Sequence, residues 1–245
     1  EDMEWWEIEH KEKYARYEEF LTRKKTPLTL LDIGSGPGHF LKTGKSLGWD
    51  VTGIEPGDSA WKYSSDVLDL NVHHAYYSEN NAEGFGKFDV VHLNNVLEHV
   101  VSAKEVVEFA GKNLGNGGLI SITSPNDYNP LQKVIVDQLE KDSWWVVPLQ
   151  HINYFNKESL ERLLRSCGFT PVYATASFPV ELFLLMGDDY IGNSTLGREI
   201  HGKRKSLELH LQNSGSTDLK RKLYDKLADL GLGRQITVMA QKNED

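Results

Sequence analysis

The sequence predicts an α/β fold with an open, mostly parallel sheet, and three observations predict it. An apolar run at 28–33 has the character of a buried parallel strand, and a glycine-rich turn and a helical pattern follow it directly. Strand-like apolar runs then alternate with helical patterns over the first two thirds of the chain. Two later segments, 170–177 and 235–242, alternate in hydrophobicity as strands do.

The composition limits the kind of protein. With 245 residues, the chain is long enough for one large domain or for a domain with a lid. The net charge of −9 argues against a nucleic-acid-binding surface, because phosphate contacts need Lys and Arg. The single cysteine, Cys167, excludes an internal disulfide framework and fits a reducing compartment. No apolar run reaches membrane-spanning length, so we expect a cytoplasmic protein without a membrane span.

The segment 1–26 predicts a helix that lies on the domain. It is densely charged, and aromatic and aliphatic residues recur in it at helical spacing until Pro27 follows. One interpretation is a covering helix with a solvated charged face. The other is a lid over a bound ligand, in which Tyr14 or Tyr17 offers its hydroxyl to that ligand.

Three glycines at alternating positions, Gly34, Gly36 and Gly38, follow the first predicted strand. Because they lack a Cβ, the backbone can turn sharply and approach a ligand, and the helix at 40–47 points its free N–H groups toward the turn. The spacing G-x-G-x-G differs from the G-x-G-x-x-G of dinucleotide sites. Asp32, just before the turn, repels phosphate but suits an ammonium group. We therefore expect a nucleotide-type ligand without a pyrophosphate, which argues against an NAD-dependent oxidoreductase.

An acid stands at the tip of the second predicted strand, 50–54. Glu55 follows the turn by roughly twenty residues, the spacing at which a carboxylate accepts hydrogen bonds from both hydroxyls of a ribose. The glycine turn and Glu55 together indicate a nucleotide-type site more specifically than either feature alone.

The rest of the chain continues the alternation of strands and helices. The expected elements are a helix at 59–70, strands at 72–75, 87–93 and 119–123, and helices at 101–114, 129–145, 157–167, 196–211 and 219–230.

Several motifs together resemble one family. The stretch DIGSGPG at 32–38, the order FDVV then VLEHV at 88–100, and the string HINYF at 151–155 are similar to class I S-adenosylmethionine (SAM)-dependent methyltransferases. The group includes ubiquinone-biosynthesis O-methyltransferases and sugar and natural-product methyltransferases. The resemblance implies a Rossmann-like, mostly parallel sheet of seven strands with an antiparallel last strand. It also implies S-adenosyl-L-methionine as the cofactor.

The resemblance further implies which residues hold the cofactor. In chain order they are Tyr14, Asp32, Gly34, Ser35, Gly36, Gly38, Glu55, Tyr76, Leu93, Asn94 and Asn95. The last three match positions that line the methyl-transfer cavity in similar enzymes. Tyr76 stands where similar enzymes commonly place an acid beside adenine.

The chain then divides into four segments. These are an N-terminal helical lid at 1–26, a SAM-binding α/β core at 27–177, a helical insertion at 178–234, and the last strand with a tail at 235–245. The insertion is expected to be a substrate lid or a homodimer contact. Asp188, Asp189 and Tyr190 in it are candidates for holding the substrate.

His151 is the candidate general base, because histidine titrates near neutral pH and its loop follows the fifth strand. A histidine that only fixes this loop is the alternative. Some relatives, including small-RNA 2′-O-methyltransferases, bind a divalent metal through E-x-x-E-H and a later histidine. Asn95 replaces the first glutamate here, so we expect no metal, with Glu98, His99 and His151 as the alternative ligand set.

These observations predict a SAM-dependent methyltransferase that acts on a small polar acceptor. The favoured acceptor is a sugar or nucleotide-sugar of surface polysaccharide or natural-product biosynthesis, because the insertion mixes apolar and polar residues. An O-methyltransferase of an aromatic or quinone-like metabolite is the first alternative, because the apolar run at 178–186 suits such a molecule. The net negative charge of the chain disfavours RNA 2′-O-methylation. A non-catalytic SAM-binding protein is the alternative of another class.

Overall fold

The structure is a computed structural model that describes residues 2–22 and 26–243. Residues 1, 23–25 and 244–245, which belong to the predicted lid and tail segments, lie outside the described part.

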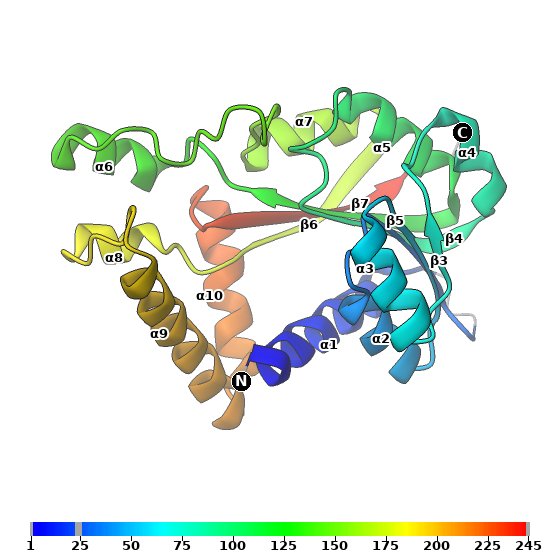
Figure 1. Cartoon of the computed structure of the whole chain (residues 1–245), viewed down its shortest axis with the longest axis horizontal. Helices are drawn as coiled ribbons and strands as arrows, with labels where there is room; N and C mark the ends of the chain where they lie inside the picture. Colours follow the sequence, from blue (N-terminus) through cyan, green and yellow to red (C-terminus); the bar gives the residue numbers. More distant parts are fainter. Residues whose placement is uncertain (1, 23–25, 244–245) are drawn as a thin grey trace.

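A seven-stranded sheet forms the centre of the molecule (Figure 1). Its strands are β1 (Thr29–Ile33), β2 (Asp50–Glu55), β3 (Val72–His74), β4 (Phe88–Asn94), β5 (Leu114–Pro125), β6 (Phe169–Ala176) and β7 (Gln235–Lys242). The order across the sheet is β3-β2-β1-β4-β5-β7-β6, and only the pairings of β7 with β5 and β6 are antiparallel among the described strands. The predicted fold class is confirmed.

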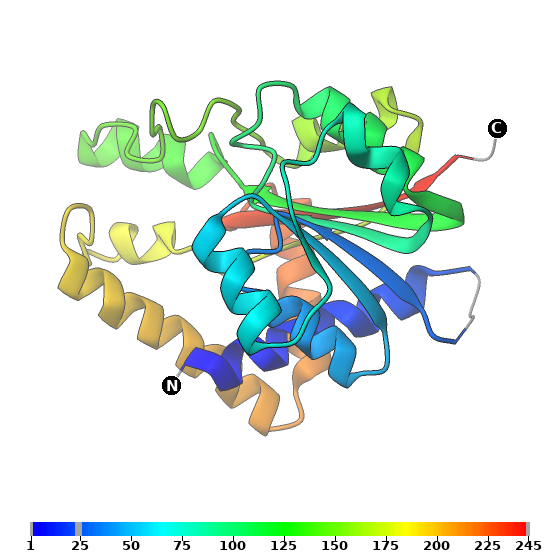
Figure 2. The same cartoon turned by 45° about the vertical axis from the view of Figure 1, so that its right-hand side comes forward.

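Helices cover both faces of the sheet (Figures 1 and 2). They are α1 (Asp2–Phe20), α2 (His39–Ser46), α3 (Asp58–Lys62), the π-helical turn η1 (Tyr63–Val67), α4 (Glu79–Ala82), the 3₁₀ turn η2 (Glu83–Phe85), α5 (Ala103–Lys112), α6 (Pro130–Leu139), α7 (Lys157–Ser166), α8 (Glu181–Leu185), α9 (Ser194–Asn213) and α10 (Thr217–Asp229). The helices α5 and α7 lie on one face, and α1, α2, α3 and α10 lie on the other. No helix in the described ranges has both the length and the apolar character of a membrane span.

The apolar strand sequences follow from this layering. Leu30 of β1 packs in the core beneath α1 and α2, whereas its neighbour Leu31 packs in the core beneath α5 and α7. Val90 and Val91 of β4 divide between the two cores in the same way. A strand covered on both faces needs apolar residues at successive positions, which is why these strands read as continuous apolar runs.

The sheet order also fixes where a ligand can bind. The chain runs outward from β1 to β2 and β3, then returns to place β4 on the other side of β1. The connections after β1 and β4 therefore leave in opposite directions and open a crevice at the carboxyl ends of these strands. The glycine turn at 34–38 lies at this crevice.

The backbone of the turn requires its glycines. Gly34, Gly36 and Gly38 have φ values of +75°, +53° and +81°, which side chains strongly disfavour. A Cβ on Gly34 would lie 2.7 Å from Val96, and one on Gly38 would lie 2.9 Å from the Cβ of Ser64. A Cβ on Gly36 would meet nothing within 4 Å, so Gly36 faces open space.

Gly38→Ala is expected to lower the free energy of unfolding by about 2–4 kcal/mol, from the left-handed backbone and the contact with Ser64 together. Gly48→Ala is the matched control, because Gly48 has φ +84° and no atom within 4 Å of a built Cβ. This variant should lower the free energy of unfolding by about 1–2 kcal/mol, from the left-handed backbone alone. Urea unfolding of both variants measures the difference, and equal losses would contradict the close packing at Gly38.

Two predicted helices end earlier than the sequence pattern indicates. The helix expected at 59–70 is α3 followed by η1, because Asp69 takes φ +51° and the Leu70 amide bonds back to the carbonyl of Ser64. The helix expected at 129–145 ends with α6, because Glu140 adopts a left-handed conformation at its C-cap. The insertion forms α8, α9 and α10, of which α10 packs on β6 (Figure 1).

Candidate active site

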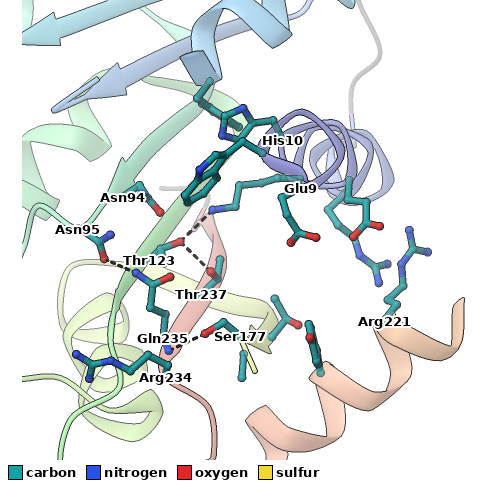
Figure 3. A pocket seen from close by; sticks show the side chains of 18 of the residues that line it. Glu9, His10, Asn94, Asn95, Thr123, Ser177, Arg221, Arg234, Gln235 and Thr237 are labelled. Carbon is teal, nitrogen blue, oxygen red and sulfur yellow. Dashed lines mark hydrogen bonds between the residues drawn. The ribbon is translucent and has the colours of Figure 1, made fainter. Parts of the chain in front are cut away.

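Two cavities lie at the carboxyl edge of the sheet. The turn cavity has a volume of about 990 Å³ and is lined by Gly34, Glu55, Tyr76 and His99, among others. The helix cavity, about 430 Å³, lies between α1, α10 and the sheet (Figure 3). Asn95 lines both cavities, so they meet at the end of β4.

The carboxylate of Glu55 lines the turn cavity and contacts the glycine turn. Its Oε2 accepts a hydrogen bond from the Gly36 amide at 2.8 Å, and its Oε1 accepts one from the Gly57 amide at 2.6 Å. Each carboxylate oxygen retains lone pairs for a further donor. The described residues that line this cavity include no Lys or Arg. The cavity therefore suits a ligand with two free hydroxyls and no phosphate.

The two tyrosines after β3 have different surroundings. Tyr76 lines the turn cavity and is 79 % exposed, so its ring is free to contact a ligand. Tyr77 also lines the cavity, but its hydroxyl donates a hydrogen bond to Asn113 Oδ1 at 2.6 Å. Burial raises the pKa of Tyr77.

The residues after β4 form the border between the cavities. Asn95 has φ +54°, and its Oδ1 accepts a hydrogen bond from Gln235 Nε2 at 3.0 Å (Figure 3). Asn94 lines the helix cavity. Leu93 is fully buried in the core and lines neither cavity.

Of the three glycines of the turn, Gly34 alone lines a cavity, and three further predicted cofactor residues lie outside both cavities. Asp32 is 3 % exposed and accepts a hydrogen bond from His92 Nδ1 at 3.0 Å. Tyr14 is 1 % exposed, stacks on Phe40 and donates a hydrogen bond to the Phe40 carbonyl at 3.3 Å. Ser35 is buried under the turn. The structure places these residues in the packing that supports the site.

The candidate substrate residues of the insertion lie outside both cavities as well. Asp188 pairs with Lys203 of α9 at 2.9 Å, and Asp189 pairs with Lys141. Tyr190 is partly buried, and burial raises its pKa. Instead, α9 and α10 contribute basic and aromatic side chains to the helix cavity.

His151 lies next to His99, with 5.0 Å between the ring centroids. The ligand atoms of Glu98, His99 and His151 all lie within 4.8 Å of one another. The Nδ1 of His99 donates to the carbonyl of Gln150 at 2.7 Å, which leaves its Nε2 with a free lone pair. Glu98 Oε2 and His151 Nδ1 are buried and have no hydrogen-bond partner among the described residues. Burial lowers the pKa of His151, and the neighbouring His99 lowers it further.

Comparison with known proteins identifies the family. A family model described as a methyltransferase domain matches residues 5–174. The chain belongs to this methyltransferase family. The ubiquinone biosynthesis O-methyltransferase of Caulobacter vibrioides is 35% identical over 104 residues, which cover 40% of this chain and 41% of that protein. Its counterpart in Colwellia psychrerythraea is 25% identical over 150 residues, covering 55% of this chain and 61% of that protein. The methyltransferase thus aligns with about two fifths to three fifths of these relatives.

Solved structures confirm the fold of this methyltransferase. A SAM-dependent methyltransferase from Archaeoglobus fulgidus has a TM-score of 0.60 at 18% identity, covering 96% of this chain and 94% of that one. A phosphoethanolamine N-methyltransferase from Haemonchus contortus, solved with SAM, has a TM-score of 0.54 at 17% identity, covering 94% of this chain and 53% of that one. The predicted class, a class I SAM-dependent methyltransferase, is confirmed.

Most residues that line the helix cavity were not predicted from the sequence. Lys13 and Arg16 lie one turn apart on α1 and both line it, and Arg221, Arg234 and Gln235 line it from the other end of the chain. The spacing of Lys13 and Arg16 puts them on one helical face, which was visible in the sequence. The sequence does not show that this face meets α10, because α1 and α10 are about 200 residues apart in the chain.

Asp127 gives the methyltransferase a pH-dependent stability. It is 2 % exposed, neither carboxylate oxygen has a hydrogen-bond partner among the described residues, and Arg234 Nη1 lies 3.9 Å away. Burial raises the pKa of Asp127 to about 6, which Arg234 opposes. Because the folded-state pKa is above the unfolded value, this group favours folding at low pH, and that contribution is lost as the pH rises through about 6.

Asp127→Asn is therefore expected to raise the free energy of unfolding by about 2–3 kcal/mol at pH 8 and to change it little at pH 4. Urea unfolding at the two pH values measures this. Asp137→Asn, an exposed residue on α6, is the control and should show no such pH dependence. A gain that is the same at both pH values would show that the carboxylate charge is not its cause.

Proposed function

We propose that this protein is a SAM-dependent O-methyltransferase whose acceptor is a small aromatic or quinone-like molecule. The observation that carries the proposal is the junction of the two cavities at Asn95. In this proposal, the turn cavity holds the cofactor and the helix cavity holds the acceptor. The reacting atoms then meet beside Asn95.

The residues of the turn cavity fit SAM. Glu55 retains lone pairs for the ribose hydroxyls, the backbone of Gly34 lines the cavity without a Cβ, and Tyr76 offers an exposed ring to the adenine. Bound there, the cofactor supplies an electrophilic methyl group on its sulfonium. The protein then contributes mainly alignment of the acceptor oxygen with that methyl group. Asn94 and Asn95, at the border of the cavities, are placed to provide this alignment.

Two observations favour an aromatic acceptor over the sugar that the sequence favours. The aligned relatives are named for ubiquinone biosynthesis. Several aromatic side chains also line the helix cavity: Trp5, Trp6, Phe40, Tyr173 and Tyr224. The contribution of α9 and α10 to this cavity favours a substrate lid over a dimer contact as the role of the insertion.

We assign His151 the role of general base. Burial and the neighbouring His99 lower the pKa of His151 and so favour the neutral imidazole, and its buried Nδ1 has no hydrogen-bond partner among the described residues. The same cluster of Glu98, His99 and His151 also fits a divalent cation with nitrogen and oxygen ligands. A cation there would lower the pKa of an acceptor hydroxyl. We therefore propose cation binding as the second role of this cluster.

The test is methyl transfer to 3,4-dihydroxybenzoate, with S-adenosylhomocysteine (SAH) and the methyl ether measured by mass spectrometry. We expect His151→Gln to lower kcat by about a hundredfold or more while SAH affinity stays within about twofold. His210→Gln, on α9 and outside the cluster of Glu98, His99 and His151, is the control. If EDTA abolishes the activity and Mg²⁺, Mn²⁺ or Zn²⁺ restores it, the result would favour cation binding by the cluster. Binding of SAH without transfer to any of a panel of catechols would favour a non-catalytic SAM-binding protein and contradict the proposal.

A further inference from the structure

The helix cavity has an excess of positive charge in a protein whose net charge is −9. Its described lining includes six cations, Lys13, Arg16, Arg204, Lys220, Arg221 and Arg234, but only two carboxylates, Glu9 and Glu12. An apolar or neutral acceptor does not need such a lining.

Two of these cations are neutralised within the protein. Lys220 is 2 % exposed and pairs with Glu9 at 2.7 Å and Glu12 at 2.9 Å. Arg204 pairs at 3.0 Å with the buried Glu208. The pairs of Lys220 hold α10 to α1, whereas the pair of Arg204 lies within α9. Of the other four cations, only Lys13 has no carboxylate within 4 Å among the described residues.

Lys13 lacks a carboxylate in contact. Its Nζ donates to Thr123 Oγ1 at 3.1 Å, and no described carboxylate lies within 4 Å of it. Burial lowers the pKa of Lys13 to about 8, so most of the side chain is still charged at pH 7. A desolvated ammonium paired only with a hydroxyl is costly, and an anionic ligand would offset that cost.

One turn along the same face of α1, Arg16 shares its carboxylate partner with Arg221. Glu19 accepts from Arg16 Nη1 at 2.5 Å and lies 3.4 Å from Arg221 Nη1, whose next carboxylate, Asp218, is 3.9 Å away. Arg16 Nη2 is buried without a hydrogen bond among the described residues, and its nearest carboxylate, Asp225, is 3.9 Å away. The guanidinium of Arg16 therefore has a donor nitrogen without a close acceptor among the described residues.

We propose that the acceptor carries a carboxylate or phosphate group, and that Lys13, Arg16 and Arg221 bind this group in the helix cavity. This inference rests on the proposed function, because it assigns the helix cavity to the acceptor. Figure 3 shows Asn94 and Asn95 on one side of the cavity and Arg221 on the other. The acidic group is bound on the side of α1 and α10, and the atom that receives the methyl group points toward Asn95.

The experiment compares two matched pairs of probes by calorimetry, with the protein saturated with SAH. One pair is 3,4-dihydroxybenzoate and 3,4-dihydroxybenzyl alcohol, and the other is glucose 1-phosphate and methyl glucoside. The first pair tests a carboxylate and the second tests a phosphate. We expect the anion of at least one pair to bind at least tenfold more tightly than its neutral partner. The double variant Lys13→Met/Arg16→Gln should abolish this preference.

Lys11→Met is the control, because Lys11 is exposed on α1 and pairs with Glu7 at 2.6 Å. It should keep the preference for the anion. Equal affinity for both members of each pair, no binding of either anion, or a preference that survives in the double variant would overturn the inference. A large loss of SAH affinity in the double variant would also overturn it, because the anion would then be the cofactor's own carboxylate. Failure of the wild-type protein to bind SAH at the start would instead refute the proposed function.

Discussion

Glu55→Ala is expected to weaken the binding of SAH by about a hundredfold or more. In the proposed complex the carboxylate accepts hydrogen bonds from both ribose hydroxyls, and each charge-assisted hydrogen bond contributes roughly 1.5–3 kcal/mol. The substitution also leaves the amides of Gly36 and Gly57 without their acceptor, which loosens the turn around the ligand. Calorimetric titration with SAH measures the dissociation constant directly.

The matched control is Asp58→Asn. Asp58 lies three residues after Glu55, is exposed, lines neither cavity and pairs with Lys62 at 2.8 Å. Its removal should leave the dissociation constant within about twofold, because an exposed pair of this kind contributes little. An affinity of the Glu55 variant within threefold of wild type would show that this carboxylate does not bind the ribose.

Lys220→Met is expected to lower the free energy of unfolding by about 3–5 kcal/mol, the usual cost of removing one partner of a buried ion pair. The ammonium of Lys220 lies between Glu9 and Glu12, and without it the two carboxylates repel each other in a desolvated site. Burial already raises the pKa of Glu9 in the intact cluster. In the variant both carboxylates should bind protons more readily in the folded state, so the defect should be larger at pH 8 than at pH 5.

Urea unfolding at the two pH values measures this effect. Lys226→Met, on the exposed side of α10, is the control and should change stability by less than about 0.5 kcal/mol. Adding Glu9→Gln and Glu12→Gln to Lys220→Met should recover most of the loss, since no buried charge is then left unpaired. A loss that the two glutamine substitutions do not reduce would mean that the packing of Lys220, and not its charge, holds α10 to α1.

The sequence was informative where a function depends on local spacing. The turn needs its glycines at 34, 36 and 38 because of their own backbone angles, and Glu55 reaches the turn because β1 and β2 are adjacent and parallel. Both features are encoded in one short stretch of chain. The strand and helix alternation that predicts the fold is equally local.

The side chains that were misplaced depend on contacts between distant segments. Asp32 was predicted to face the cofactor, but the register of β1 with β4 puts it opposite His92, and the pair is buried. Tyr14 was predicted to reach the ligand, but it packs on α2, where Gly44 leaves the space for its ring. No pattern in a single sequence gives the register of β4 or the rotation of α1.

The measurement that tests the account most directly is calorimetric titration of the wild-type protein with SAM and SAH, with NAD as the control. We expect micromolar binding of SAM and SAH and no binding of NAD, because the turn cavity offers a carboxylate for the ribose and no described Lys or Arg for a pyrophosphate. Binding of NAD, or failure of both SAM and SAH to bind, would contradict it.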